Sequence, residues 1–354
     1  MSRPWQLSLI ALASSLILAG CSSPDSSPRS GGGGGDVAEG GIGGSGSGTA
    51  SAYGSIWIGG NRHFPVADDA VVRLDGEPVA ANSINAVGRG LPLGVTVEYL
   101  LADDANADLT EGTAVALDAW HEVIGPVTSV APLTVLNQPV YTTSATLLDN
   151  LAAPAELQVG DLVAVAGLPN SVGSIRATRL AHLQTPPLNW QIRGRVQDLD
   201  ASQFRLGEQI VARNGLTPEQ CGDGLANGRK VILQASPQAG FSGSDPLNTG
   251  WRLVCQREGL GLFADRQGLP ATLPAAVDGI ITAIELAPLR ISLNGQRVHL
   301  QNLLDIGVAT LSDLALGARL EIEGQLDTAS GEITATRLGA RDPLIRIEAP
   351  VDSL

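Results

Sequence analysis

Two cysteines, Cys221 and Cys255, are the residues whose type and spacing point to the most definite chemistry. In an exported chain such an even pair favours a disulfide, and closing a loop of about 34 residues contributes roughly 2–4 kcal/mol to the free energy of unfolding. Two free thiols are the alternative. The pair lacks C-x-x-C spacing and has no histidine nearby, which argues against a metal or redox site.

The third cysteine, Cys21, follows a segment with the pattern of an export signal. Arg3 provides positive charge, and the apolar residues 7–18 fall short of the about 20 residues that a membrane-spanning helix needs. The run Leu18-Ala19-Gly20-Cys21 resembles the bacterial lipobox, in which the cysteine sulfur is acylated. We therefore expect residues 1–20 to be a lipoprotein signal peptide and Cys21 to be the lipidation site. An ordinary secretory signal is the alternative.

The residue after the lipidated cysteine bears on location. It is Ser22 and not Asp, which by resemblance to the usual sorting pattern favours the outer membrane. The sequence therefore predicts a lipid-anchored protein of the cell envelope, facing the periplasm or the surface. Residues 21–52 are rich in Ser and Gly and are expected to be a flexible tether.

Side chains that bind metals or act as general bases are scattered. The four histidines lie in different parts of the chain, at His63, His121, His182 and His299. A metal site or an activated nucleophile needs convergent side chains, and this spacing brings none together. We expect solvated or linker histidines, and no G-x-S-x-G, H-E-x-x-H or P-loop motif is present. The sequence therefore predicts a protein that is not an enzyme.

One acidic run offers a weak cation site. Asp104, Asn106 and Asp108 place oxygen ligands at alternate positions, as the start of a calcium loop does. Leu109 then stands where the loop needs Gly, and Val115 where it needs the bidentate Glu. A solvated loop is the better interpretation, with a weak calcium site as the alternative, and we expect no cofactor.

The composition narrows the range of partners. A net charge of −14 repels phosphate backbones, and 3% aromatic residues leave few stacking platforms, so nucleic acid is not expected. Four tryptophans are expected in cores or between modules, with a ligand platform as the alternative. They are Trp57, Trp120, Trp190 and Trp251.

These residues are positioned by a pattern that recurs four times. It is clearest at residues 291–300, where apolar residues alternate on both sides of Asn294-Gly295, the signal of a type I′ hairpin. Related hairpins begin at Arg73, Val135, Arg205 and Ser292. Further along each copy, L-x-x-G-x-x-[VL]-x-[VILY] predicts a tight turn into a strand, with its glycine at Gly94, Gly160, Gly228 and Gly317. A closing strand is clearest at residues 175–180 and 333–338.

Each copy has the order of a small barrel. Five strands with a short helix or loop between the third and fourth are typical of an OB-like barrel, and an SH3-like barrel or open meander fits almost as well. The sequence therefore predicts an all-β chain of four tandem barrels, arranged as separate beads. The expected modules are residues 53–120, 122–183, 190–259 with an insertion and the disulfide, and 276–338, followed by a tail over 339–354.

The repeats resemble a known bacterial family. G-x-[IV] at the start, L-x-x-G-x-x-V-x-V in the middle and I-x-A-x-x-L at the end are similar to the domain of unknown function 5666, most closely in the second and fourth copies. The first copy lacks the Ala-rich closing strand, and the third carries an insertion. The resemblance implies a secreted or lipid-anchored β-module and brings no catalytic residues.

Two functions fit these observations. The first is a non-enzymatic envelope lipoprotein, bound to the membrane by its N-terminal lipid, that presents its modules as a structural or protein-binding array. The second is a lipoprotein that binds a small ligand or glycan with its barrel loops. An envelope protein or a glycan is the expected partner. A deep pocket shared by modules favours the second function, and flat convex modules favour the first.

Overall fold

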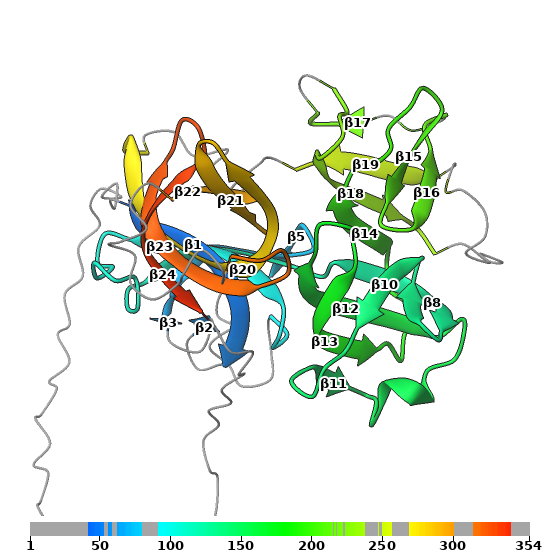
Figure 1. The fold of residues 1–354 in the computed structure, drawn as a ribbon. Helices are drawn as coiled ribbons and strands as arrows, with labels where there is room; N and C mark the ends of the chain where they lie inside the picture. Colours follow the sequence, from blue (N-terminus) through cyan, green and yellow to red (C-terminus); the bar gives the residue numbers. More distant parts are fainter. Residues whose placement is uncertain are drawn as a thin grey trace, which may run out of the picture. The chain divides into compact units, whose positions relative to one another are not determined.

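The computed structural model describes an all-β protein (Figure 1). Its described residues are 42–52, 56–58, 62–79, 91–214, 216, 218–221, 224–237, 247, 250–256, 269–300 and 314–340. Within them the regular elements are β-strands and one short 3₁₀ turn, η1 (Pro154–Glu156). The predicted signal peptide, Cys21 and most of the tether lie outside the described residues. No helix in the described part is long and apolar enough to cross a membrane.

The second and fourth modules are closed five-stranded barrels. The second consists of β8 (Val123–Val130), β9 (Leu133–Val135), β10 (Gln138–Tyr141), β12 (Leu162–Pro169) and β13 (Ile175–His182). The fourth consists of β20 (Thr272–Leu286), β21 (Leu289–Leu293), β22 (Gln296–His299), β23 (Arg319–Asp327) and β24 (Ile333–Ala340). In both, the strands pair in the order 1-2-3-5-4-1, and only strands 3 and 5 run parallel. This is the connectivity expected of an OB-like barrel.

The first module follows the same order with a different first strand. That strand is β1 (Ile42–Ala52), and it pairs with β2 (Ile56–Ile58), which pairs with β3 (Arg62–Phe64). Beyond Pro65 the chain continues as β4 (Val66–Leu74), which runs parallel to β7 (Ala114–Trp120), and β6 (Thr96–Ala102) returns the pairing to β1. The predicted hairpin at Arg73 forms, but its second strand, β5 (Glu77–Val79), lies outside this circuit.

The expectation that residues 21–52 form a flexible tether is therefore wrong for residues 42–52. The small residues that indicated a tether have a packing role in β1. A Cβ built on Gly46 would lie 2.2 Å from the Ala276 carbonyl oxygen and 2.3 Å from the Tyr99 hydroxyl oxygen, so only glycine fits there. A composition that cannot form a core by itself is here required by close packing against other strands.

The third module has the same order with weaker links. β14 (Trp190–Arg195) pairs with β18 (Lys230–Ala235), which pairs with β19 (Trp251–Cys255). Among the described residues, the hairpin of β15 (Gln203–Leu206) and β16 (Gln209–Ala212) is joined to the rest of the module through the isolated bridges Gln197–Arg205 and Val211–Leu247. The prediction of four barrels is thus confirmed only for the second and fourth modules, in which the strand pairing closes completely. Two short strands, β11 (Leu147–Asp149) and β17 (Pro218–Glu219), add to the second and third modules.

Local turn chemistry agrees with the sequence. Gly94, Gly160, Gly228 and Gly317 have φ values of 86°, 98°, 83° and 86°, and a strand begins two residues after each. At the fourth hairpin, Asn294 and Gly295 have φ values of 47° and 93°, as a type I′ turn requires. The repeat signatures therefore mark the same turns in every module.

The disulfide between Cys221 and Cys255 is confirmed, with Cα atoms 4.9 Å apart. It joins the segment after β17 to the end of β19. Both cysteines belong to the hydrophobic core that the second and third modules share, and Cys255 lies opposite Val231 in the β18–β19 ladder.

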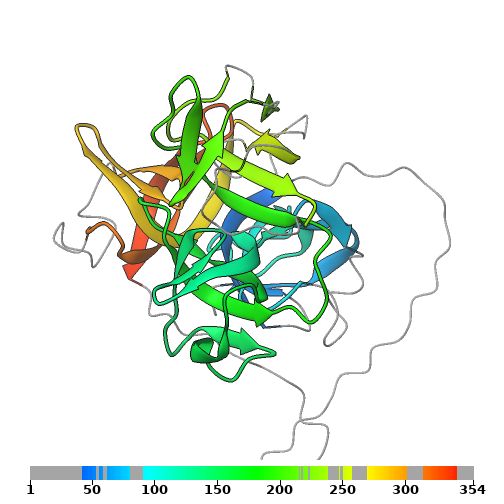
Figure 2. The ribbon, with the colours of Figure 1, turned by 90° about the vertical axis from the view of Figure 1, so that its right-hand side faces the viewer.

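The modules are not separate beads, because they share sheets. β1 pairs with β6 of the first module and, in parallel, with β20 of the fourth, which gives a 12-stranded sheet (Figure 1, Figure 2). β8 pairs with β14, which joins the second and third modules in a 10-stranded sheet. Unpaired strand edges offer backbone donors and acceptors, and joining edges satisfies them. Sequence repeats gave no information about which edges would meet.

Candidate functional site

The predicted hairpin turns lie at contacts between modules. Asp75, in the turn of the first module, accepts hydrogen bonds from the His121 backbone N–H at 2.7 Å and from Gln191 of the third module at 3.0 Å. Asn137 of the second module donates to Gln209 of the third at 2.9 Å. The Arg195 guanidinium of the third module lies against Gly295 of the fourth.

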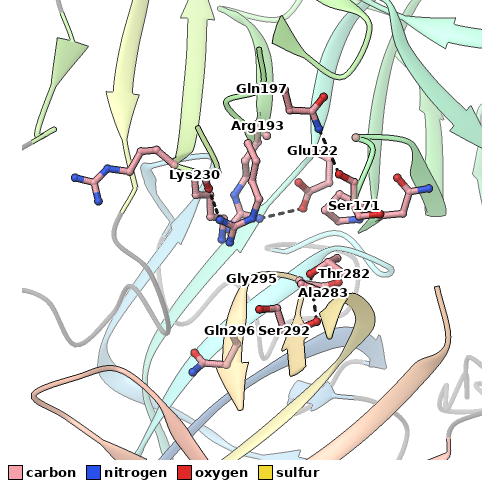
Figure 3. A pocket seen from close by; sticks show the side chains of 18 of the residues that line it. Glu122, Ser171, Arg193, Gln197, Lys230, Thr282, Ala283, Ser292, Gly295 and Gln296 are labelled. Atoms are coloured by element: carbon pink, nitrogen blue, oxygen red, sulfur yellow. Dashed lines mark hydrogen bonds and ion pairs between the residues drawn. The ribbon is translucent and has the colours of Figure 1, made fainter. Parts of the chain in front are cut away.

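All four modules line a cavity of about 580 Å³, and Arg195 and Gly295 belong to its lining. Figure 3 shows Arg193, Gln197 and Lys230 of the third module on one side, opposite the β20 and β21–β22 residues of the fourth. Thr96 and Glu98 come from the first module and Glu122 and Gln138 from the second. The volume is within the about 300–1,000 Å³ usual for small-molecule sites. We call this space the central cavity.

The charge of the central cavity is opposite to that of the chain. Its lining includes five cationic side chains and two carboxylates, Glu98 and Glu122, an excess of three positive charges in a protein of net charge −14. The cationic residues are Arg193, Arg195, Arg229, Lys230 and Arg297. An acidic composition does not predict such a lining, and it can only be found once the fold brings distant strands together.

A buried ion network holds one wall in place. Arg193 donates to Glu122 at 3.0 Å and to Gln256 at 2.9 Å, and approaches Glu98 at 3.5 Å. Its guanidinium also lies 5.1 Å from the ring centre of Trp120. The side chains of Arg193 and Glu122 are only 4% and 3% exposed, so the network is rigid and shielded from solvent.

Lys230 stands beside this network. Its ammonium is 3.6 Å from Glu98. Burial lowers the pKa of Lys230, and the neighbouring positive charge of Arg193 lowers it further, while Glu98 and Glu122 act in the opposite direction. The two cations Arg193 and Lys230 and the two carboxylates thus balance one another. The remaining cationic residues of the lining are Arg195, Arg229 and Arg297, of which Arg297 pairs with Glu332 at 3.2 Å.

A third carboxyl group lies behind the same wall. Asp118 of β7 pairs across the sheet with Glu98 of β6. Burial raises the pKa of Asp118 to about 7, and the charge of Glu98 adds to the rise. One carboxyl oxygen, Oδ1, is buried without a hydrogen-bond partner among the described residues. Asp118 therefore changes charge near neutral pH at the joint between modules.

Two further polar atoms of the lining lack partners in the described structure. The Arg229 Nε atom is buried and unpartnered, while its Nη2 donates to the Cys221 carbonyl at 3.0 Å. The Gln296 Oε1 atom is also buried and unpartnered, while its Nε2 donates to the Gly331 carbonyl at 2.7 Å. These two atoms are a donor and an acceptor that are buried within the protein and do not face solvent.

The residues expected to bind calcium are used otherwise. Asp104 accepts the Thr113 N–H at 2.9 Å, and Asn106 accepts the Thr110 N–H at 2.8 Å. The Asp108 carbonyl accepts from Arg62 at 2.9 Å. Within the described ranges no group of three or more His, Cys, Asp or Glu side chains is arranged to hold a metal ion. The run stabilises the turns before β7.

The histidines and tryptophans have structural surroundings. His121 is buried at the joint between the first two modules, and its Nδ1 is 2.7 Å from Asp75. His299 lies 3.1 Å from Glu332 in the fourth module, so these two histidines are far from convergent. Trp120, Trp190 and Trp251 are 5–7% exposed, which fits core or joint positions. Of the expected site residues that the structure describes, none lines the central cavity.

The cavity residues could not be recognised from the sequence, because each is surrounded only by a local repeat pattern. Arg195, Arg229 and Arg297 each stand beside a repeat signature, the opening strand, the turn glycine or the hairpin. The repeat explains the neighbouring glycines and apolar residues, and it does not predict that these arginines line a common cavity. A charged residue next to a repeat turn was the sequence feature that could have pointed to these arginines.

Fold and site define a class of protein, namely a tandem OB-like barrel protein with a cavity between its modules. Two segments, residues 124–181 and 278–339, match the family model of a domain of unknown function, DUF5666. The chain therefore carries DUF5666 repeats, and the two matches coincide with its two closed barrels.

Other comparisons add little. No curated protein matches the chain. A solved structure described as "drosophila Unr CSD456" is similar at 11% identity over 63% of this chain and 96% of that chain. Its TM-score is 0.15, so the OB-like assignment depends on the strand pairing described above and on nothing from that structure.

Proposed function

We propose that this protein is a non-enzymatic ligand-binding lipoprotein of the bacterial cell envelope, which holds a small polar ligand in the central cavity. The observation that carries the proposal is the cavity itself, about 580 Å³ and lined by all four modules. A purely structural array of barrels needs no such space, whereas small-ligand sites are concave and form between domains.

The walls have the rigidity that a binding site needs. The Arg193 network fixes the side that comes from the first three modules, and the β21–β22 hairpin forms the opposite side. Preorganised walls reduce the entropy lost when a ligand binds. The ligand contacts come from residues of different modules, so binding also links the two sheets.

The lipid anchor is part of the proposal. Acylated Cys21 would hold the body at the membrane through the residues that join it to β1. Palmitate labelling of the wild type and of Cys21→Ala tests this anchor. Equal labelling of the two would contradict it.

The ligand-binding function is tested by native mass spectrometry of the full mature protein, solubilised from envelope in mild detergent. We expect the wild type to carry an adduct of fixed small mass. Ala283→Trp, which places an indole at an exposed position of the cavity lining, should remove the adduct. Ala329→Trp, at an exposed turn outside the cavity, is the matched control and should retain it.

The result that would refute this function is equally definite. A wild type free of small-molecule adducts, bound instead in fixed ratio to another envelope protein, would support the structural or protein-binding array. An adduct that persists in Ala283→Trp would place the ligand elsewhere on the chain.

A further inference from the structure

We infer that the fourth module of this protein binds a second copy of the same chain. The turn Leu316-Gly317 of one copy docks on Thr336 and Arg337 of β24 in the other. This binding is separate from the ligand function, because neither Leu316 nor Thr336 lines the central cavity. The chain already makes one contact of this kind between two of its own modules.

That contact joins the turn glycine of the first module, Gly94, to the closing strand of the second. The Gly94 carbonyl accepts a hydrogen bond from the Thr178 hydroxyl, and the Leu93 carbonyl accepts one from Arg179 at 3.4 Å. A Cβ built on Gly94 would lie 2.9 Å from the Arg179 Cβ and 3.1 Å from the Thr178 carbonyl oxygen. Gly94 is buried and Leu93 is half-buried. We call this arrangement the internal turn contact.

The turn of the fourth module has the same sequence pattern and backbone, but it is exposed. Residues 314–317 read L-A-L-G where residues 91–94 read L-P-L-G, and Gly94 and Gly317 both have a φ of 86°. Leu316 is 60% exposed, and a Cβ built on Gly317 would meet nothing within 4 Å. Among the described residues, the Gly317 carbonyl accepts no hydrogen bond, whereas the Gly94 carbonyl does. An apolar side chain and a backbone acceptor therefore face solvent together.

The closing strand of the fourth module is exposed as well. Residues 335–338 of β24 read A-T-R-L, as residues 177–180 of β13 do. Thr336 is exposed, and the Arg337 side chain is 69% exposed, compared with 17% for Arg179 in the internal turn contact. The fourth module therefore presents both halves of that contact, the turn and the strand, to solvent.

The first module contacts the neighbouring strand β23 and leaves this strand accessible. Arg62 of β3 binds the Glu323 side chain, while Thr336 beside it remains exposed. The Thr336 hydroxyl donates to the Glu323 carbonyl at 3.2 Å, which is longer than the about 2.5–3.0 Å usual for such bonds. The Gly317 carbonyl of a second copy would accept this hydroxyl in place of the Glu323 carbonyl.

A second copy is the partner that carries both complementary halves. Each chain has one Leu316 turn and one exposed A-T-R-L strand, so two copies either close a symmetric dimer or associate head to tail. The contact consists of one leucine and one or two hydrogen bonds. Such a small interface gives weak association, so we expect a reversible equilibrium between monomer and oligomer.

Cross-linking of the full mature protein in mild detergent tests the position of the contact. Leu316→Cys from one preparation and Thr336→Cys from another are mixed and oxidised, with the native Cys221–Cys255 disulfide intact. We expect a disulfide-linked dimer that contains one copy of each variant. Leu188→Cys, at a position that is 88% exposed, replaces Leu316→Cys in the control and should give at least about tenfold less dimer.

Sedimentation equilibrium in density-matched detergent measures the association itself. We expect the wild type to form dimers or larger oligomers as its concentration rises to about 0.1 mM. Leu316→Glu should weaken this association at least about tenfold, because it places a charge in the contact. Leu188→Glu is the matched control and should associate as the wild type does. Both variants change exposed side chains, so both should fold.

Three results would overturn the docking of copies through the fourth module. The first is a wild type that stays monomeric up to about 0.1 mM. The second is equal association of the wild type and Leu316→Glu, or equal cross-linking of Leu316→Cys and Leu188→Cys. The third is cross-linking of Thr336→Cys to Val159→Cys in place of Leu316→Cys, which would assign the docking turn to the second module. Leu316→Glu should keep the small-molecule adduct, so a missing adduct affects the ligand function alone.

Discussion

The two pairs of modules are joined in different ways. The second and third modules follow each other in sequence, share the β8–β14 pairing and have one continuous hydrophobic core. The first and fourth modules are far apart in sequence and keep largely separate cores, linked by β1 between β6 and β20. Neighbouring copies merge by burying apolar surface, whereas distant copies are held by backbone pairing and ion pairs.

The junction between the first and fourth modules contains more specific contacts than the junction between the second and third. Arg62 of β3 donates to Glu321 at 2.7 Å and to Glu323 at 2.9 Å on β23, and its side chain is 4% exposed. Gly46 lets β1 pass between Ala276 and Tyr99. Such contacts depend on single residues, so the first–fourth junction should be more sensitive to point substitution than the second–third junction.

The largest expected effect is that of Gly46→Val. The new Cβ would meet a backbone carbonyl 2.2 Å away, so β1 must move from β20, at a cost of about 4 kcal/mol or more in unfolding free energy. Hydrogen exchange should accelerate in β6 and β20 and stay unchanged in β8 and β14. Gly339→Ala, whose Cβ meets open space, is the control. Equal acceleration in all four strands would show that the two pairs unfold as one unit.

Replacing Arg62 should have the next largest effect. Arg62→Met removes the buried cation that Glu321 and Glu323 share, and we expect a loss of about 3 kcal/mol in denaturant unfolding. Arg337→Met removes the exposed partner of the same Glu323, at 3.3 Å, and should cost at most about 1 kcal/mol. Similar losses for the two variants would mean that the buried pair does not hold the junction.

The smallest expected effect is on the pH dependence of stability. It concerns a residue at the place where the first–fourth pair of modules meets the second–third pair. Because the pKa of Asp118 is about 7 in the folded protein and about 3.9 in an unfolded chain, the folded state binds this proton more tightly. Stability from this group therefore falls as pH rises from about 4 to 7 and is constant below and above this range. Asp118→Asn should flatten the dependence between pH 5 and 8, measured by urea unfolding.

A comparison with Asp200 sharpens this prediction. Hydrogen bonds from Ser202 and Gln203 hold the pKa of Asp200 below its usual range, so its contribution is lost only as pH falls through the acidic range. Asp200→Asn should leave the slope between pH 5 and 8 unchanged. If Asp118→Asn also leaves that slope unchanged, Asp118 does not titrate near neutral pH.

Much of the local structure follows from the sequence. The turn glycines, the Asn294-Gly295 hairpin, the closing strands and the Cys221–Cys255 pair depend on residues near one another or on cysteine chemistry. Steric rules for φ > 0 and the alternation of apolar residues operate over a few positions, so they can be recognised without the fold. The barrel connectivity follows from the same local rules, repeated in order.

The sheet junctions and the central cavity were decided only by the tertiary structure. The Gly and Ser residues of β1 have the composition of a linker, and only their position against Tyr99 and Ala276 makes them a strand. The cavity arginines carry no motif, because their common position depends on which strand edges pair across more than a hundred residues. Local patterns determine the modules of this protein, and the long-range pairing of their edges determines its site.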